Sequence, residues 1–358
     1  MRHTGRARRR RWAGGCPALF ALLCLIGSAA PHTAGANGAP ALNEFHRGRI
    51  LARAAGLPRL HSLLVSVGGE LIEEHYFNGA AAHRSANLKS ASKTIIAILV
   101  GIAIDRGYLA GVDQPIVDFF PDELADAEAA KRSITVGDLL SMRAGLETTS
   151  NRNYGRWVRS RHWVRHALSR PLVDRPGGRM IYSTGSTHLL SAILTRATGM
   201  STLEFGRRYL ARLLGITLPS WTRDPQGVYL GGNEMGLTPR AMLAVGNLFR
   251  RGGTGDGRQV ISREWIRAST VPRTRSRFSG RQYGYGWWMR TLAGHRTYYA
   301  WGYGGQFIFV IPDLDAVIVA TSSPNPGSGR RRHRRELDDL IACDLVPAIR
   351  RAVAEAAQ

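Results

Sequence analysis

The chain has 358 residues, of which 44% are hydrophobic and 21% are charged. This composition is ordinary for a globular protein and too apolar for a disordered chain. Beyond the first thirty residues no run is long and apolar enough to cross a bilayer, which excludes a polytopic membrane protein.

The net charge of +23 is carried almost entirely by arginine. Only three lysines occur, at Lys89, Lys93 and Lys131. Without the six arginines of residues 1–35, 43 basic residues still face 26 acidic ones. Such a chain could bind an anionic envelope surface. An arginine-rich genome explains this bias better than nucleic-acid binding does, so no specific nucleic-acid partner is expected.

Residues 1–36 have the pattern of a secretory signal peptide. A basic stretch at 1–11 precedes an apolar run at 17–26, and small residues follow up to Ala36. The chain is therefore expected to be exported to the periplasm or secreted, with an uncleaved N-terminal membrane anchor as the alternative. After the leader only Cys343 remains, which cannot form an internal disulfide.

The next elements in chain order are a short helix, a hairpin and a long buried helix. Residues 41–56 form an amphipathic pattern, and residues 61–67 and 70–77 predict two strands joined at two glycines. Residues 90–106 predict a mostly buried helix. Further helices are then predicted at residues 135–142, 157–168, 187–198, 202–214 and 239–250.

Towards the C-terminus the pattern returns to strands. The predicted strands cover residues 283–290, 297–301, 306–311 and 316–321, and an amphipathic helix closes the chain at 336–356. Strands near both ends with helices between them predict an α+β fold, in which one antiparallel sheet is completed by both ends of the chain and covered by the terminal helices. Residues 37–130 and 271–358 would form the sheet subdomain, and residues 131–270 an inserted helical subdomain.

Ser90 and Lys93 form a Ser-x-x-Lys motif at the start of the long helix. Residues three apart share a helix face, so the hydroxyl and the amine can meet. A serine hydroxyl needs a base to become a nucleophile, and a lysine serves as that base only when it is uncharged. Burial lowers a lysine pKa, whereas arginine does not deprotonate in proteins. The alternative is a helix-capping serine with a solvated lysine.

Two further motifs fit the same chemistry. Tyr182 begins Tyr182-Ser183-Thr184; a phenol beside an ammonium has its pKa lowered and can transfer protons. Residues 302–306 read Gly-Tyr-Gly-Gly-Gln, and glycines there would let a substrate approach the backbone. The N–H groups of Gly305 and Ser90 could form an oxyanion hole, worth about 3–4 kcal/mol per donor. The alternatives are a core tyrosine and an ordinary turn.

In this order the three motifs resemble the serine β-lactamase and penicillin-binding protein superfamily, over about residues 45–350. The chain looks most similar to its class C-like branch, which includes esterases, D-alanyl-D-alanine peptidases and 6-aminohexanoate-oligomer hydrolases. Further stretches agree with this resemblance: residues 99–105, 134–142, 145–146, 285–288 and 312–315.

The resemblance implies a β-lactamase/transpeptidase-like fold with a five-stranded antiparallel sheet flanked by the terminal helices. It also implies catalytic roles for three residues. Ser90 would be acylated, and Lys93 and Tyr182 would activate it and relay the proton. The family often has Asn where this chain has Thr184, and its β-lactamases have Lys-Thr-Gly where this chain has residues 302–304. Both departures argue against efficient β-lactam hydrolysis. Substrate contacts are expected from Thr184, Trp301, Tyr303 and Gly304. No cofactor is expected, and the histidines show no metal-ligand spacing.

The sequence therefore predicts an exported serine hydrolase that cleaves an ester or amide, including peptide-like small molecules, through an acyl-enzyme on Ser90. One alternative is a β-lactamase or D-alanyl-D-alanine carboxypeptidase. Another is a non-catalytic protein that binds the envelope through its basic surface.

Overall fold

The structure is a computed structural model that describes residues 40–358. These residues belong to one compact unit. The predicted signal peptide, residues 1–36, lies outside the described residues.

Among residues 40–358, no helix combines the length and the hydropathy that crossing a membrane requires.

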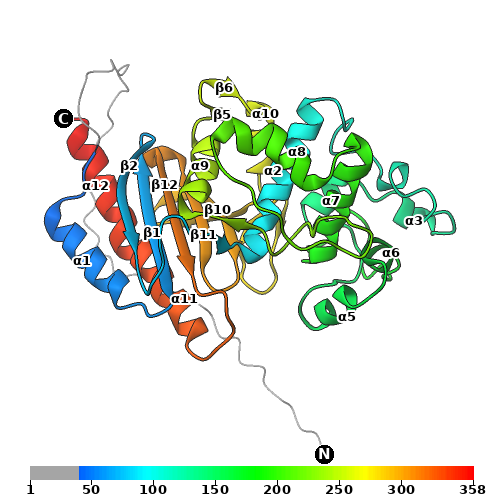
Figure 1. The fold of residues 1–358 in the computed structure, drawn as a ribbon, viewed down its shortest axis with the longest axis horizontal. Helices are drawn as coiled ribbons and strands as arrows, with labels where there is room; N and C mark the ends of the chain where they lie inside the picture. Colours follow the sequence, from blue (N-terminus) through cyan, green and yellow to red (C-terminus); the bar gives the residue numbers. More distant parts are fainter. Residues whose placement is uncertain (1–39) are drawn as a thin grey trace, which may run out of the picture. The chain divides into compact units, whose positions relative to one another are not determined.

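An antiparallel sheet lies at the centre of the fold, and both ends of the described chain contribute to it (Figure 1). Strand β1 lies between β2 and β12, and Val65 of β1 is paired with Ile318 of β12. The eight strands, in sheet order, are β2 (Glu70–Tyr76), β1 (Leu60–Val67), β12 (Ala316–Ser322), β11 (Gln306–Ile311), β10 (His295–Gly302), β9 (Trp288–Leu292), β8 (Gln282–Tyr283) and β7 (Thr274–Arg275).

The prediction of a five-stranded sheet was wrong, because the sheet has eight strands: the stretch predicted as one strand at 283–290 overlaps both β8 and β9, and β7 was not predicted. Strands β7 and β8 have two residues each, too few for an alternating pattern to be visible in the sequence. The stretch 283–290, predicted as one strand, is interrupted: the Gly284 N–H donates to the Trp287 carbonyl at 2.9 Å, and Gly286 has φ 78°. The α+β architecture and the antiparallel pairing are confirmed.

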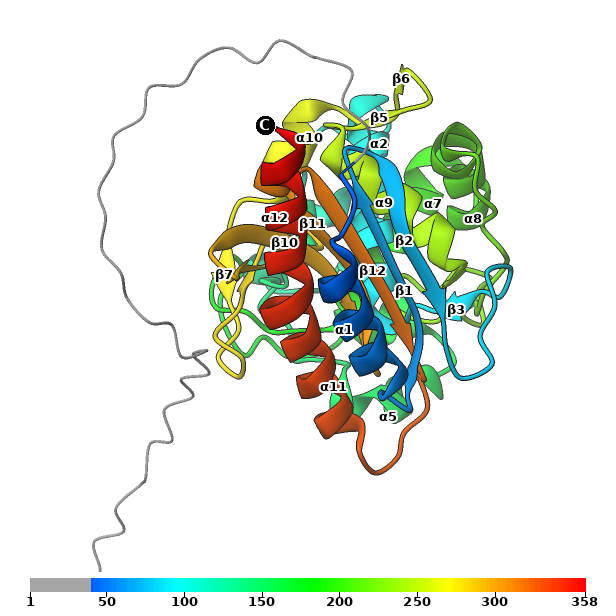
Figure 2. The ribbon, with the colours of Figure 1, turned by 90° about the vertical axis from the view of Figure 1, so that its left-hand side faces the viewer.

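Helices cover both faces of the sheet. The terminal helices α1 (Glu44–Ala55), α11 (Arg330–Asp339) and α12 (Val346–Ala356) lie on one face (Figure 2). Helices α2 (Ser92–Asp105) and α9 (Pro239–Arg250) lie on the other. All residues of β11 and β12 are therefore buried, which explains why residues 307–311 and 316–320 are continuously apolar rather than alternating.

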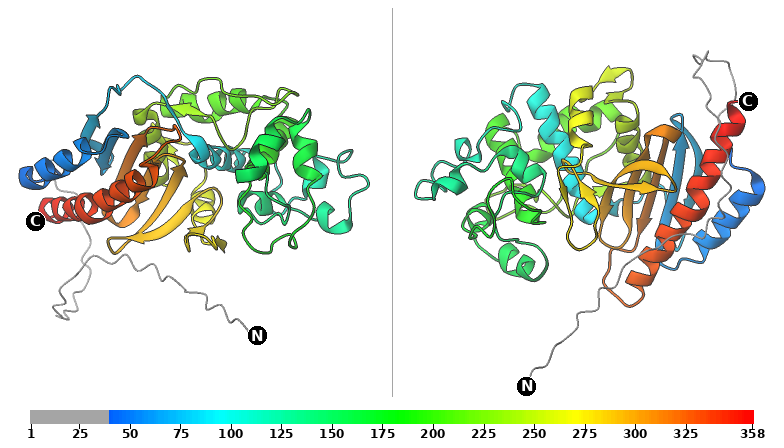
Figure 3. Two further views of the ribbon diagram at one scale, coloured as in Figure 1. Left: turned by 90° about the horizontal axis from the view of Figure 1, so that it is seen from below. Right: turned by 180° about the vertical axis from the view of Figure 1, so that it is seen from behind.

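Most of the remaining helices lie on the side of α2 that is away from the sheet (Figure 3). The most buried of them, α7 (Thr184–Thr198), contacts α2, α4 (Val136–Leu140) and α6 (Trp163–Leu168). The single helix predicted at 157–168 is instead two, α5 (Tyr154–Val158) and α6, because His162 leaves the helical conformation and caps α6. The others are α3 (Ala129–Arg132), α8 (Thr202–Gly206) and α10 (Arg263–Ser269). The predicted division into two subdomains stays a prediction.

Candidate active site

Ser90 and Lys93 meet at the start of α2, as their spacing predicts. Ser90 lies in a 3-10 turn, Lys89–Ala91, that leads directly into the helix. Lys93 Nζ is 3.4 Å from Ser90 Oγ. Ser90 is half-buried, whereas the Lys93 side chain is only 2% exposed. The serine is thus accessible, and the amine is held behind it in the core.

The surroundings of Lys93 favour an uncharged amine. Burial lowers the pKa of Lys93 from 10.5 to about 7. Its Nζ donates to the Gly232 carbonyl at 2.6 Å and to Thr184 Oγ1 at 3.2 Å. Among the described residues no carboxylate accepts a hydrogen bond from Nζ, so the ammonium form gains no ion pair that would offset its desolvation. A neutral amine that donates its two N–H groups to these acceptors would keep its lone pair free to accept the proton of the Ser90 hydroxyl, whose oxygen is 3.4 Å away.

The turn that carries Ser90 is held in an unusual backbone conformation. Lys89 has φ 49°, which costs a non-glycine residue about 1–2 kcal/mol. The Lys89 N–H donates to Asn87 Oδ1 at 2.9 Å, and Lys89 Nζ forms an ion pair with Glu234 at 3.0 Å. Asn87 also donates to Glu234 at 2.6 Å. These contacts, which the sequence analysis did not anticipate, position the turn before the nucleophile.

Tyr182 lies two residues before α7, with its ring 5.1 Å from Lys93 Nζ. Burial raises the pKa of Tyr182, and a side-chain hydrogen bond with Ser90 offsets part of this increase. The net effect is a pKa raised to about 12. The expectation of a lowered phenol pKa was therefore wrong, because burial dominates and the lysine beside it is poised to be uncharged. Near neutral pH Tyr182 keeps its proton and can donate it.

The sequence analysis missed the segment 221–232, called here the bridging segment. Its last residue, Gly232, supplies the carbonyl that accepts from Lys93. A Cβ on Gly232 would lie 2.5 Å from Thr187 Oγ1 and 3.0 Å from Lys93 Nζ. A Cβ on Gly231 would lie 2.0 Å from the Thr187 carbonyl. Two adjacent glycines in the sequence can indicate close packing, but Thr187, against which both of them pack, is far away in the sequence.

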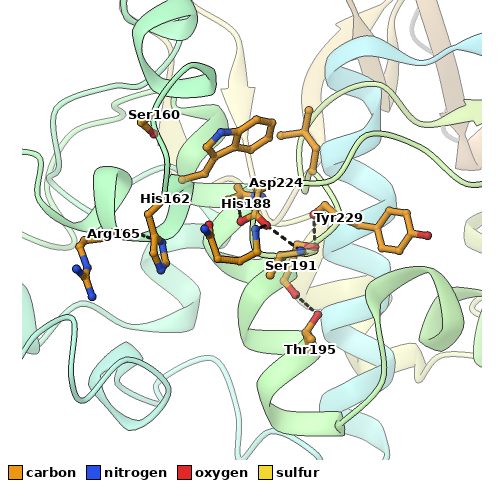
Figure 4. Close-up of polar contacts among 12 residues, drawn as sticks. Ser160, His162, Arg165, His188, Ser191, Thr195, Asp224 and Tyr229 are labelled. Atoms are coloured by element: carbon orange, nitrogen blue, oxygen red, sulfur yellow. Dashed lines mark hydrogen bonds and ion pairs between the residues drawn. The ribbon is translucent and has the colours of Figure 1, made fainter.

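A buried pair fixes the bridging segment to α7. His188 Nε2 lies 3.0 Å from Asp224 Oδ2, and both side chains are fully inaccessible to solvent (Figure 4). One turn further along α7, Ser191 Oγ donates to the Tyr229 carbonyl at 2.7 Å. Because the segment ends at Gly232, these contacts position the carbonyl that binds Lys93.

The glycine motif at the end of β10 lies against the nucleophile turn. A Cβ on Gly302 would lie 2.0 Å from the Leu88 carbonyl. The Gly305 N–H, however, donates to the Gly302 carbonyl at 3.3 Å, and a Cβ on Gly305 would face Ser322. A Cβ on Gly304 would lie 2.5 Å from the Ser323 carbonyl. The oxyanion-hole role of Gly305 with Ser90, and the substrate contact of Gly304, stay predictions.

The three other predicted substrate contacts have different surroundings. Thr184 is buried and bonded to Lys93 and, at 2.9 Å, to Ser150 Oγ, so it supports the amine. Trp301 is partly buried and stacks on Phe307. Tyr303 is 39% exposed. Substrate contact by these residues also stays a prediction.

The described residues contain no group of three or more His, Cys, Asp or Glu side chains that could hold a metal ion. The site is therefore built from an alcohol, an amine, a phenol and backbone groups.

Comparisons with known proteins agree on one family. The sequence model of the family described as Beta-lactamase matches residues 61–342. The 6-aminohexanoate-dimer hydrolase of Paenarthrobacter ureafaciens is 27% identical over 339 residues, and the match covers 84% of each chain.

Two solved structures illustrate the common fold. A penicillin-binding protein homologue from Caulobacter crescentus has a TM-score of 0.67 at 18% identity, covering 87% of this chain and 96% of its own. EstCE1, described as a hydrolase with promiscuous acyltransferase activity, has a TM-score of 0.66 at 17% identity, covering 84% of this chain and 99% of its own.

Proposed function

Because the chain belongs to the β-lactamase family and is a serine hydrolase of that family, we propose that it cleaves an ester or amide through an acyl-enzyme on Ser90. The observation that carries this proposal is the buried amine of Lys93, 3.4 Å from Ser90 Oγ, with a pKa lowered to about 7. An amine in this state can accept a proton at neutral pH, which a solvated lysine does rarely.

In the proposed first step the Ser90 hydroxyl transfers its proton to the uncharged Nζ of Lys93. The oxygen then attacks the substrate carbonyl, forming a tetrahedral intermediate. Tyr182, which keeps its phenolic proton, gives it to the leaving alcohol or amine, and the ammonium of Lys93 can restore the proton. Because these groups exchange protons, Lys93 and Tyr182 act as a coupled pair.

In the second step the same pair activates water against the acyl-enzyme. Water loses a proton to the basic group, attacks the acyl carbonyl and releases the acid, and Ser90 recovers its proton. No cofactor is needed for either step, since bonds are exchanged without oxidation or reduction.

Small esters are the proposed substrate class, with linear amides second. Thr184 binds Lys93 where the family often places an amide side chain, and residues 302–304 lack the lysine of β-lactamases. Both features weaken the hold on a β-lactam. Amides are included because the Paenarthrobacter ureafaciens relative is named for 6-aminohexanoate dimer.

The test is hydrolysis of p-nitrophenyl butyrate by the protein and by its Ser90→Ala variant. We expect the variant to lose at least about a thousandfold in kcat/KM, because the covalent step is removed. Labelling of the active protein by a fluorophosphonate probe, located at Ser90 by mass spectrometry, would also exclude a non-catalytic binding role. Hydrolysis at the original rate by Ser90→Ala would refute the proposal.

The second candidate, a β-lactamase or D-alanyl-D-alanine carboxypeptidase, is favoured by the Ser-x-x-Lys motif that these enzymes share. Nitrocefin turnover decides between the two. An esterase of the proposed type should hydrolyse nitrocefin far more slowly than p-nitrophenyl butyrate, and the reverse order would favour the second candidate.

We also propose that the protein is exported, to the periplasm or beyond. Support comes from the basic stretch and the apolar run within residues 1–36. The mass of the protein recovered from a periplasmic or culture fraction would show whether the leader has been removed.

A further inference from the structure

Away from Ser90, a pocket of about 710 Å³ opens beside the helical segment that follows α8. None of Ser90, Lys93 and Tyr182 lines it. Four arginines from two separate stretches of chain are among the residues that line it, namely Arg207, Arg208, Arg212 and Arg223. A pocket of this size accommodates a small organic molecule.

A local irregularity of the helix places Arg207 and Arg212 closer to one face than a regular α-helix would. Residues Arg207–Ala211 form a π-helical turn, in which the Arg212 N–H donates to the Arg207 carbonyl. Five residues complete this turn, so Arg207 and Arg212 come close to the same face. In a regular α-helix their side chains would diverge, because residues five apart do not align. Such π-turns occur frequently at functional sites.

Two of the four arginines are held in place by neutral acceptors. Arg207 Nε donates to the Leu218 carbonyl at 2.9 Å, which leaves the outer nitrogens of its guanidinium available. Arg223 donates to the Tyr229 hydroxyl, and its guanidinium lies 4.4 Å from the centre of the Tyr229 ring. These contacts order the side chains without neutralising their charge.

The pocket consequently has an excess of positive charge. Glu204 is the one carboxylate in its lining, and within the described part of the chain it forms no ion pair with any of the four arginines. The pKa of the Tyr229 phenol is affected by these arginines. Burial raises this pKa, but hydrogen bonds with Ser220 and Arg223 and the charges of Arg223 and Arg207 lower it, and the net effect is a lowered pKa. Figure 4 shows that this phenol points away from the His188–Asp224 pair.

We propose that this pocket binds the phosphate group of a small phosphorylated molecule, at a site separate from Ser90. Guanidinium groups form paired hydrogen bonds with phosphate oxygens, and arginines that line one pocket from two segments can contact several oxygens of one group. The buried side chains of Leu203 and Tyr229 supply an apolar floor for the organic part of the ligand.

The test is calorimetric titration of the full chain with inorganic pyrophosphate at constant ionic strength, because charge interactions at a surface are screened by salt. We expect saturable binding with one site per chain. Arg223→Gln and Arg207→Gln should each weaken it about tenfold or more, the loss of a charge-assisted hydrogen bond. Arg350→Gln, which removes an exposed arginine on α12, is the matched control and should leave binding unchanged.

Because Arg207 and Arg223 also bond to their neighbours, Arg212→Gln is included as a variant that removes charge from an exposed position in the lining. It should also weaken pyrophosphate binding, while thermal unfolding confirms that the variant is folded. Absence of saturable binding, or equal weakening by Arg350→Gln, would overturn the proposal. Succinate that binds as tightly as pyrophosphate would overturn the assignment to phosphate.

Discussion

Lys93 determines how the site should respond to pH. Its pKa is lowered to about 7 by burial, and the amine must be uncharged to accept the Ser90 proton. We therefore expect kcat/KM for p-nitrophenyl butyrate to rise with pH, with an apparent pKa of about 7. The pKa of Tyr182 is raised to about 12, so no fall due to phenol ionisation should occur below about pH 10.

The measurement is initial rates from about pH 5 to pH 9.5, corrected with Ser90→Ala for spontaneous hydrolysis. A rate that declines through neutral pH would contradict a role for Lys93. So would a rate that is already level from about pH 5 upward, as a carboxylate base with a pKa of about 4 would give.

Gly232 should tolerate no side chain, because the carbonyl it presents to Lys93 lies in a crowded place. Gly232→Ala would press a methyl group against Thr187 Oγ1 and Lys93 Nζ. A shift of about 1 Å at a catalytic group can cost a hundredfold in rate, so we expect kcat/KM to fall by about tenfold to a hundredfold. Gly48→Ala is the matched control: its methyl group would meet no atom within 4 Å, and the helix α1 should gain stability.

Sequence alone could place Ser90 beside Lys93, because helical geometry dictates the contact between positions three apart. It could add Tyr182 only through the family resemblance. Gly232 could not be found, since it is 139 residues from Lys93 and only the folded chain brings its carbonyl to the amine. The pKa of Tyr182 was misjudged for a related reason: burial, which dominates it, depends on tertiary packing.

At the scale of elements, the His188–Asp224 pair should hold α7 and the bridging segment together. Removing one partner of a buried hydrogen bond leaves the other unsatisfied, which costs about 1–3 kcal/mol. Asp224 also accepts from the Gln226 and Val228 N–H groups, so we expect Asp224→Ala to lower the free energy of unfolding by about 2 kcal/mol or more. Asp126→Ala, at an exposed position, is the control and should change stability little. Urea unfolding of both variants measures the difference.

If Asp224→Ala were as stable as the control, the pair would not be holding the bridging segment. A loss of stability together with a lowered kcat/KM at temperatures where the variant is folded would show that the segment also positions Gly232.

The elements differed in how well their patterns revealed them. Helix α9 and strand β11 match their predicted bounds, because one is strongly amphipathic and the other is a short apolar run between turns. Strands β7 and β8 carry no such signal. They belong to the sheet because β8 pairs with the edge of β9 and β7 pairs with β8. Which strands pair in space cannot be deduced from segments of two residues.

At the scale of the molecule, the sequence could predict that strands from both ends of the chain form one sheet. Apolar strands at each end must pair with other strands and be covered by helices. Where α11 covers this sheet it buries a histidine. His333 is 2% exposed, and its Nε2 lies 2.9 Å from Ser322 Oγ of β12. Burial, followed by the charge of Arg59, lowers the pKa of His333 from 6.5 to about 4.

His333 should therefore make the folded state sensitive to acid. In the unfolded chain the imidazole binds a proton as the pH falls through about 6.5, whereas the folded protein resists protonation until about pH 4. Between these values the unfolded state holds more protons, so the free energy of unfolding should fall by about 2–3 kcal/mol. Above about pH 6.5 the imidazole is neutral in both states, and it contributes no pH dependence there.

The measurement is urea unfolding at pH 7 and about pH 4.5 for the protein, for His333→Gln and for the control His83→Gln, an exposed position. His333→Gln should lose less stability on acidification than the original protein, whereas His83→Gln should follow it. An unchanged acid response in His333→Gln would place the sensitive group elsewhere. The carboxylates whose pKa is lowered by arginine, such as Glu74 and Glu123, would then be examined next, because their contribution is lost below about pH 4.5.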